Sequence, residues 1–248
     1  MSTNPSLYLH CKPGDTAPRV LLTGDPARVH RIADALDDVR IVSQNREYTV
    51  ATGRHREVPI TAVSAGIGAP STAIAIEELA QLGARVIVRV GTMMSIDPEK
   101  APMGTALVST GAARFEGTSA AYLPSAYPAV PHWGLAHHLL LKAAWHRLTV
   151  VSGLTATYDA FYPSMAPSLV GRGNLDLEPL RQAGILALDM ETSLVHIMGT
   201  KFGIATAALC LVTVQAEPFT TLDSDERSRL EERLIAAALD GLIGFDGA

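Results

Sequence analysis

Residues 85–92, with the sequence RVIVRVGT, constrain the fold of this chain more than any other stretch. Apolar β-branched side chains occupy both sides of this segment, which predicts a strand buried on both faces of a sheet. Arg89 is unusual there, because an unpaired buried guanidinium costs on the order of several kcal/mol. We therefore expect an anionic partner near the carboxyl end of the strand, where open α/β sheets bind ligands. This partner is either an internal carboxylate such as Glu77 or an oxyanion beside Gly91 and Thr92.

Composition narrows the class of protein. The 248 residues are 48% hydrophobic and 18% charged, which favours one domain, residues 1–248, with a sizeable core. The net charge of −5 argues against nucleic acid as a partner. The two cysteines are distant in sequence, and neither a signal peptide nor an apolar run of about 20 residues occurs. We expect a cytoplasmic protein with no membrane partner, and the scattered histidines predict no metal site.

A possible anion site follows the short apolar strand 19–23. Gly24 permits a close backbone approach, Asp25 is a good helix N-cap, and Pro26 suits the first helical turn. The helix is expected to continue to about Leu36. Arg28 in its first turn opposes the helix dipole, so it either binds an anion there or pairs with Asp25 at the surface.

Alternating strands and helices follow along the chain. Strand pieces are expected at 40–44 and 47–52, and the segment 58–92 reads as a βαβ unit with a helix at 71–82. Its glycine-rich turn lacks G-x-G-x-x-G and the P-loop lysine, so a dinucleotide site is not indicated. Residues 114–133 read as a surface excursion. Further strands at 107–110, 148–155, 185–188 and 204–214, with helices at 134–147, 189–203 and 224–242, predict an α/β fold with a mixed twisted sheet flanked by helices on both faces.

Two more segments carry candidate ligand-binding groups. Phe161 lies in a proline-broken loop, where exposed aromatic rings either stack on flat ligands or anchor the loop. Asp189 and Glu191 lie where a buried strand passes into a helix. They either cap that helix or hold sugar hydroxyls at the same rim of the sheet as Arg89.

Together these motifs resemble one family. The chain is similar to uridine phosphorylase and its relatives in the nucleoside phosphorylase superfamily, over most of its length and in the same order. The matching segments are Gly24-Asp25-Pro26, Asn45-Arg46-Glu47, residues 66–71, residues 77–83, residues 89–92, residues 127–130, Phe161-Tyr162-Pro163 and Asp189-Met190-Glu191.

The resemblance implies a role for individual residues. Gly24, Arg28, Arg89 and Thr92 fall at the family's phosphate site, and Arg46 falls at the position that reaches this phosphate from a neighbouring subunit. Met190 and Glu191 fall at the ribose site and Phe161 falls beside the base, with Arg89 and Glu191 as the catalytic pair. The resemblance also implies homodimers that assemble into homohexamers with shared active sites, inorganic phosphate as co-substrate, and neither cofactor nor metal.

Several positions depart from the family pattern. Asp189 stands in place of a ribose-site glutamate, and Tyr8 replaces an N-terminal histidine that touches the ribose. Near the base the chain has Met93 and Met94 in place of small residues, Met165 and Pro167 in place of the uracil-reading glutamine and arginine, and Thr213 and Val214 in place of the purine enzymes' acid and the uridine enzymes' arginine. The phosphate half therefore matches the family, whereas the base half matches neither class.

The expected function is phosphorolysis of an N-ribosyl nucleoside to ribose 1-phosphate and a base of unknown identity. Two alternatives remain at this point. One is a nucleoside hydrolase, against which the arginines argue. The other is a catalytically weak nucleoside-binding relative, which an apolar base pocket would suit.

Overall fold

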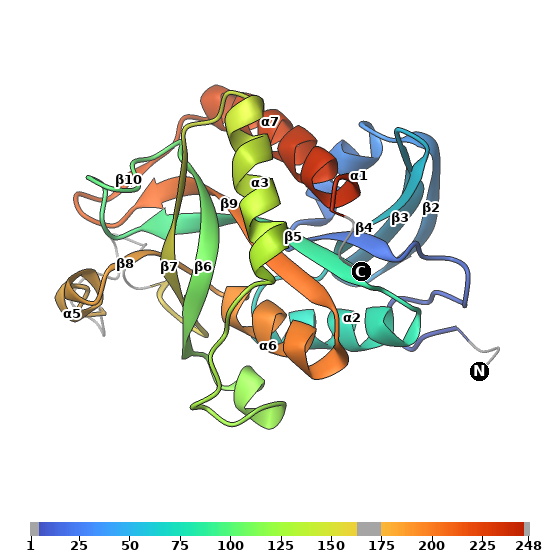
Figure 1. Ribbon diagram of the computed structural model, residues 1–248, viewed down its shortest axis with the longest axis horizontal. Helices are drawn as coiled ribbons and strands as arrows, with labels where there is room; N and C mark the ends of the chain where they lie inside the picture. Colours follow the sequence, from blue (N-terminus) through green and yellow to red (C-terminus); the bar gives the residue numbers. More distant parts are fainter. Residues whose placement is uncertain (1–4, 163–174, 246–248) are drawn as a thin grey trace.

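The computed structural model describes residues 5–162 and 175–245, and these residues build a mixed sheet between two layers of helices (Figure 1). The ten strands are β1 (Arg19–Thr23), β2 (Asp37–Asn45), β3 (Tyr48–His55), β4 (Val58–Ser64), β5 (Val86–Ser95), β6 (Ala106–Phe115), β7 (Val150–Tyr158), β8 (Ile185–Asp189), β9 (Ala205–Gln215) and β10 (Thr220–Thr221). The predicted fold class is confirmed.

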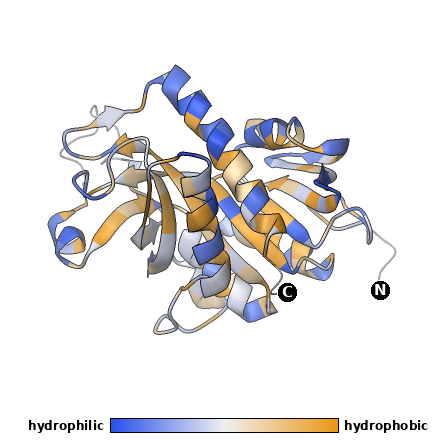
Figure 2. Ribbon diagram, turned by 45° about the horizontal axis from the view of Figure 1, so that its top comes forward, coloured by the Kyte–Doolittle hydropathy of each residue, from blue (hydrophilic) through white to orange (hydrophobic). Residues whose placement is uncertain are grey.

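Helices cover both faces of the sheet. One layer contains α1 (Pro26–Ala33), α3 (Trp133–Trp145) and α7 (Ser224–Ile243), and the other contains α2 (Ala69–Gln81), α6 (Thr192–Phe202) and the short 3-10 helix η1 (Thr118–Ala121). A further short helix, α5 (Glu178–Gln182), precedes β8. Hydrophobic residues concentrate in the central strands and on the inner sides of the helices, as Figure 2 shows. No helix of the described part is long and apolar enough to cross a bilayer.

The side chains of β5 point alternately to the two helix layers, as the sequence pattern predicts. Val86, Val88 and Val90 pack in the core under α1, α3 and α7. Ile87 packs in the opposite core, under α2 and α6. Because side chains alternate along a strand, Arg89 points to the same face as Ile87. The first turns of α2 and α6 are therefore near its guanidinium.

The sheet closes on itself over half of its strands. The order is β10-β9-β6-β7-β8-β5-β1-β4-β3-β2, and β9 also pairs with β5, so β5, β9, β6, β7 and β8 form a closed ring. Along one edge β5 pairs with β1 as far as Arg89, opposite Leu22, and then pairs with β8 from Met94, opposite Leu188. Between these two positions β5 changes neighbour. Such a change of strand order is where open α/β sheets place their ligands.

Local signals place several element ends correctly. The Asp25 side chain caps α1 by accepting a hydrogen bond from the Ala27 N–H at 2.9 Å. Gly83 follows α2 with a φ of +93°, a left-handed conformation that favours glycine. The N-terminal segment lies against α2, because Glu78 accepts hydrogen bonds from the N–H groups of Tyr8 and Leu9.

Other boundaries differ from the sequence prediction. The first helix ends at Ala33 rather than Leu36, and the expected strand pieces are one long hairpin, β2–β3. The strands β4 and β5 are parallel as predicted, but β1 lies between them. The surface excursion at 114–133 contains η1 and two buried polar residues, Glu116 and Ser119. The segments α5, β10 and η1 were not predicted, since each is too short to show a periodic pattern.

Candidate active site

A cavity of about 700 Å³ opens where β5 changes neighbour. It is bordered by the turns after β1, β4 and β8, by the ends of β5 and β9, and by the start of α7. The predicted site residues that line it are Gly24, Arg28, Arg89, Thr92, Phe161, Asp189, Met190, Glu191 and Thr213. The structure thus brings together residues that are up to 189 positions apart in the sequence, from Gly24 to Thr213.

Arg89 is 5% exposed and is paired with two carboxylates. Its Nε donates to Asp189 at 3.1 Å, and its Nη2 donates to Glu191 at 2.5 Å. Burial alone would lower the pKa of Arg89, but the charges of Glu191 and Asp189 outweigh burial and raise it. The alternative partner Glu77 is wrong, because that carboxylate instead accepts a hydrogen bond from the Tyr122 hydroxyl.

Glu191 links the starts of two helices to β5. It is the N-cap residue of α6, yet its side chain makes no capping hydrogen bond to α6. Its Oε1 instead accepts from the N–H of Gly68 at 2.6 Å, at the N-terminus of α2. Burial raises the pKa of this carboxyl, although Arg89 opposes the shift. Its charge therefore depends on its two partners, Arg89 and the amide of Gly68.

The prediction that Asp189 caps the following helix is confirmed, because its carboxylate binds an N–H group at the start of α6. Its carboxylate accepts from the Thr192 N–H at 3.0 Å, from the Thr192 hydroxyl at 2.5 Å and from the Thr157 hydroxyl at 2.8 Å. Together with the bond from Arg89, these contacts engage both carboxylate oxygens. The residue ties Arg89 to β7 and α6, and a ribose hydroxyl would have to compete with these internal donors.

Arg28 is 4% exposed and enters the cavity from the other helix layer. Its Nη1 donates to the Thr23 hydroxyl at 2.9 Å, and its Nη2 donates to Glu231 at 3.1 Å. Its buried Nε has no hydrogen-bond partner among the described residues. The suggested surface pair with Asp25 is wrong, since the Asp25 carboxylate lies 3.4 Å from Arg31.

Gly24 allows two turns of the cavity wall to touch. A Cβ at this position would lie 2.9 Å from the backbone oxygen of Gly66, closer than real Cβ atoms come. Both glycines line the cavity. A larger residue at position 24 would therefore separate the turn before α1 from the turn before α2.

The other end of the cavity is apolar. Phe161 is buried, and it is clustered with Met94, Leu188, Met190 and Val214. These five side chains all line the cavity, as do Met93 and Thr213. Met165 and Pro167, predicted to stand where the family reads uracil, lie outside the described residues. An apolar wall of this kind suits a flat heterocycle.

Two predicted site residues lie away from the cavity. Arg46 is exposed in the turn between β2 and β3, and its guanidinium lies 5.7 Å from the centre of the Tyr8 ring. Tyr8 in turn packs edge-on against Tyr48. Within one chain neither residue lines the cavity, so their predicted roles at phosphate and ribose stay predictions.

Several residues that line the cavity were not predicted as site residues, among them Glu47, Ile67 and Arg227. Arg227 belongs to α7, which was interpreted only as an amphipathic closing helix. One signal was available in the sequence. Glu231 falls three residues before Leu234, on the face of α7 that packs inward, and a carboxylate there requires cationic partners.

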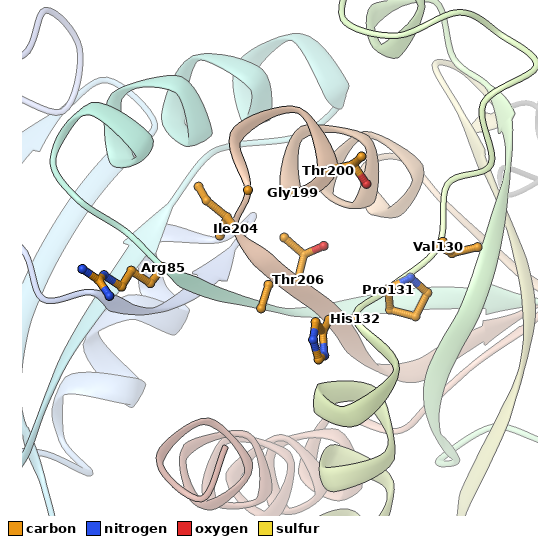
Figure 3. A pocket seen from close by; sticks show the side chains of 10 residues that line it. Arg85, Val130, Pro131, His132, Gly199, Thr200, Ile204 and Thr206 are labelled. Carbon is orange, nitrogen blue, oxygen red and sulfur yellow. The ribbon is translucent and has the colours of Figure 1, made fainter. Parts of the chain in front are cut away.

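A second cavity, of about 530 Å³, lies at the opposite ends of β5 and β9 (Figure 3). Its lining residues include Arg85, His132, Thr200 and Thr206, and it lies beside the last turn of α6. The carbonyl groups at a helix C-terminus disfavour an anion. Among the described residues no cluster of histidine, cysteine and carboxylate side chains could hold a metal ion. The arrangement of polar groups therefore favours the first cavity as the site.

The fold and the arginine–carboxylate site define a protein class that comparison with known families identifies. The chain belongs to the phosphorylase superfamily, whose sequence profile matches residues 18–243. Within that superfamily it is similar to the uridine phosphorylase of Thermococcus kodakarensis, with 37% identity over 217 residues, covering 83% of this chain and 76% of the relative. It is also 34% identical to the guanosine phosphorylase of Halorubrum lacusprofundi, over 86% of this chain and 83% of the relative.

Solved structures agree with this assignment. Uridine phosphorylase from Vibrio fischeri superimposes with a TM-score of 0.86 at 29% identity, covering 99% of this chain and all of the other. Purine nucleoside phosphorylase from Toxoplasma gondii, in complex with immucillin-H, superimposes with a TM-score of 0.88 at 27% identity, covering 98% and 97% of the two chains. The resemblance inferred from sequence motifs is confirmed.

Proposed function

We propose that this protein is a pentosyltransferase that cleaves an N-ribosyl nucleoside with inorganic phosphate, releasing ribose 1-phosphate and a free base. One observation carries this proposal. The buried Nε of Arg28, which lacks a partner in the described part of the chain, and the Arg89–Glu191 pair line the same cavity. Uridine and guanosine phosphorylases among the relatives support the same reaction class.

The phosphate is proposed to bind between Arg28, Thr92 and the turn at Gly24. Charge-assisted N–H···O bonds, about 2.7–2.9 Å long, hold an oxyanion strongly and in a defined orientation. Because Asp189 and Glu191 already hold Arg89 in place, its guanidinium is oriented before the substrate arrives. Phosphate held in this way is aligned with the anomeric carbon, and such alignment supplies much of the rate enhancement.

Glu191 is proposed to act on the sugar. As the glycosidic bond stretches, the ribose acquires oxocarbenium character, and the phosphate dianion stabilises that positive charge. The Glu191 carboxylate is fixed between Arg89 and the Gly68 N–H, so it offers its remaining acceptor sites to ribose hydroxyls in one orientation. Met190, the adjacent cavity residue, is proposed to pack against the sugar ring.

The base is proposed to lie in the apolar end, against Phe161. Thr213 is 6% exposed and lines this end, where its hydroxyl can donate or accept one hydrogen bond. The identity of the base stays open, because an apolar wall accepts several heterocycles. The same wall would also suit a binding protein of low activity, which is the second candidate function. The phosphorylase relatives lend no support to a hydrolase.

The assembly is part of the proposal. We infer that Arg46 enters the phosphate site of a neighbouring subunit, in a homodimer that assembles further into a homohexamer. The exposed position of Arg46, away from its own cavity, is compatible with such a role.

The decisive experiment is a nucleoside panel incubated with and without inorganic phosphate, with ribose 1-phosphate measured directly. Phosphate-dependent product is expected for at least one nucleoside. Arg28→Ala should abolish that dependence, whereas Arg85→Ala should retain it, because Arg85 is an exposed arginine at the other cavity. Equal cleavage in phosphate-free buffer would contradict phosphorolysis. Nucleoside binding without product would favour the binding protein.

A further inference from the structure

One buried carboxylate on α7 is shared by three arginines. Glu231 is 1% exposed. Its Oε1 accepts from Arg28 Nη2 at 3.1 Å and from Arg227 Nε at 2.9 Å, and its Oε2 lies 2.9 Å from Arg31 Nη2. The three guanidinium groups come from α1 and α7, which Glu231 thereby ties together at the rim of the cavity.

The charges in this cluster do not balance. Burial opposes ionisation of Glu231, but the charge of Arg28 and the hydrogen bond from Arg227 outweigh burial and hold the pKa of this carboxyl below its ordinary range. Glu231 therefore carries one negative charge among three guanidinium groups. Asp25 lies 3.4 Å from Arg31 and offsets a second positive charge. Three guanidinium groups and two carboxylates leave this cluster with one net positive charge, and Arg28 still has a buried, unpartnered Nε within the described chain.

Arg227 is an arginine of this cluster that lines the cavity and that sequence motifs did not assign. It lines the cavity beside Arg28 and the turn at Gly24, and its side chain is 45% exposed. Its Nε is engaged by Glu231, while its two terminal nitrogens have no hydrogen-bond partner among the described residues. The guanidinium is thus fixed at one nitrogen, and the residue lines the cavity with its other nitrogens unpaired in the described chain.

We propose that Arg227 is a further phosphate-binding residue, supplied by α7, which closes the phosphate end of the cavity over the bound oxyanion. This inference rests on the proposed function. Phosphate dianion accepts several hydrogen bonds at once, so it can bind a further guanidinium besides Arg28 and Arg89, and a planar guanidinium suits paired oxygens. Glu231 holds Arg28 and Arg227 on one carboxylate oxygen, so the two guanidinium groups keep a fixed spacing for one ligand.

The first test uses inorganic phosphate alone, so it does not depend on the nucleoside. Phosphate binding raises the unfolding temperature by mass action, and the titration yields a Kd. Arg227→Gln should weaken phosphate binding about tenfold, the lower end of what losing a hydrogen bond to a charged group costs. Arg229→Gln is the matched control, because Arg229 is exposed on the same helix and does not line the cavity. Its Kd should stay within about twofold of the wild type.

The second test separates binding from a merely structural role. In steady-state phosphorolysis, Arg227→Gln should raise the KM for phosphate about tenfold while the KM for the nucleoside stays unchanged, and Arg227→Lys should recover part of the loss. An unchanged phosphate Kd and KM in Arg227→Gln would overturn the inference, as would an equal loss in Arg229→Gln. A wild-type protein that phosphate does not stabilise at all would overturn the proposed function itself.

Discussion

Replacing Arg89 with alanine tests whether this residue supports the fold, the phosphate site or both. The guanidinium lies between two buried carboxylates, with hydrogen bonds of 3.1 Å to Asp189 and 2.5 Å to Glu191. Both carboxylates are at most 5% exposed, so they depend on Arg89 as their cationic partner. The variant would therefore leave two neighbouring buried carboxyl groups without their shared cationic partner.

The expected loss of stability is large. Removing one partner of a buried ion pair costs about 3–5 kcal/mol, because the remaining charge is uncompensated. Domains are stable by only about 5–15 kcal/mol, so Arg89→Ala should lose a substantial fraction of its free energy of unfolding. Phosphate binding should weaken in addition, by about 1.5–3 kcal/mol for the lost charge-assisted contact.

Urea unfolding of a double-variant cycle separates these effects. Glu191→Gln removes one of the two carboxylate charges while it preserves the side-chain shape and an acceptor for the Gly68 N–H. The double variant Arg89→Ala/Glu191→Gln should recover at least about 1 kcal/mol relative to the sum of the single losses, because the two residues are in contact. Phosphate affinity should not recover, since the guanidinium is still missing.

Two results would refute this reasoning. If Arg89→Ala loses less than about 1 kcal/mol, the buried ion pairs do not support the fold. If the losses of the two single variants add to within about 0.5 kcal/mol, Arg89 and Glu191 are not coupled.

Two further predictions concern the cavity wall and the opposite end of α7. Gly24→Ala should weaken phosphate binding on the order of tenfold or more, because the new Cβ would meet the Gly66 carbonyl at 2.9 Å, whereas Gly117→Ala, with no contact closer than 3.7 Å, should not. Burial opposes ionisation of Asp240, but hydrogen bonds from His55 and His146 outweigh it and lower the pKa of this carboxyl. Its contribution to stability is therefore present above the ordinary aspartate pKa of about 3.9 and is lost as the pH falls through the lower folded-state value. Asp240→Asn should lower the free energy of unfolding by about 1–3 kcal/mol at pH 7, and denaturant titrations should show this gap closing below about pH 4. A gap that is unchanged at pH 3 would contradict this assignment.

Local patterns were sufficient to predict most elements, and the predicted residues Gly24, Arg28, Arg89 and Thr92 do line one cavity. The apolar run of β5, the Asp25 cap and the glycine after α2 are determined by residues close in sequence. A charged Arg89 in an otherwise apolar strand correctly predicted a buried anionic partner. The nearby Glu77 is not that partner. The partners Asp189 and Glu191 are 100 and 102 positions away, and only the pairing of β5 with β8 brings them close.

Long-range pairing also explains what could not be predicted. Closure of the strand ring depends on β5 meeting β8 and β6 meeting β9, contacts to which no local periodicity points. Arg227 and Glu231 have the spacing of an ordinary surface pair on a helix. Their place at the cavity becomes evident only when α7 is packed across the sheet from α2 and α6.

The change of neighbour along β5 has an evolutionary consequence. The groups proposed to bind phosphate come mainly from elements before this point and from α7, whereas the apolar wall comes from the end of β5, from β8 and β9, and from Phe161. Mutations can therefore remodel the proposed base-binding wall without disturbing the groups proposed to bind phosphate. A lineage built on this scaffold is free to exchange one nucleobase for another while it conserves a single chemistry.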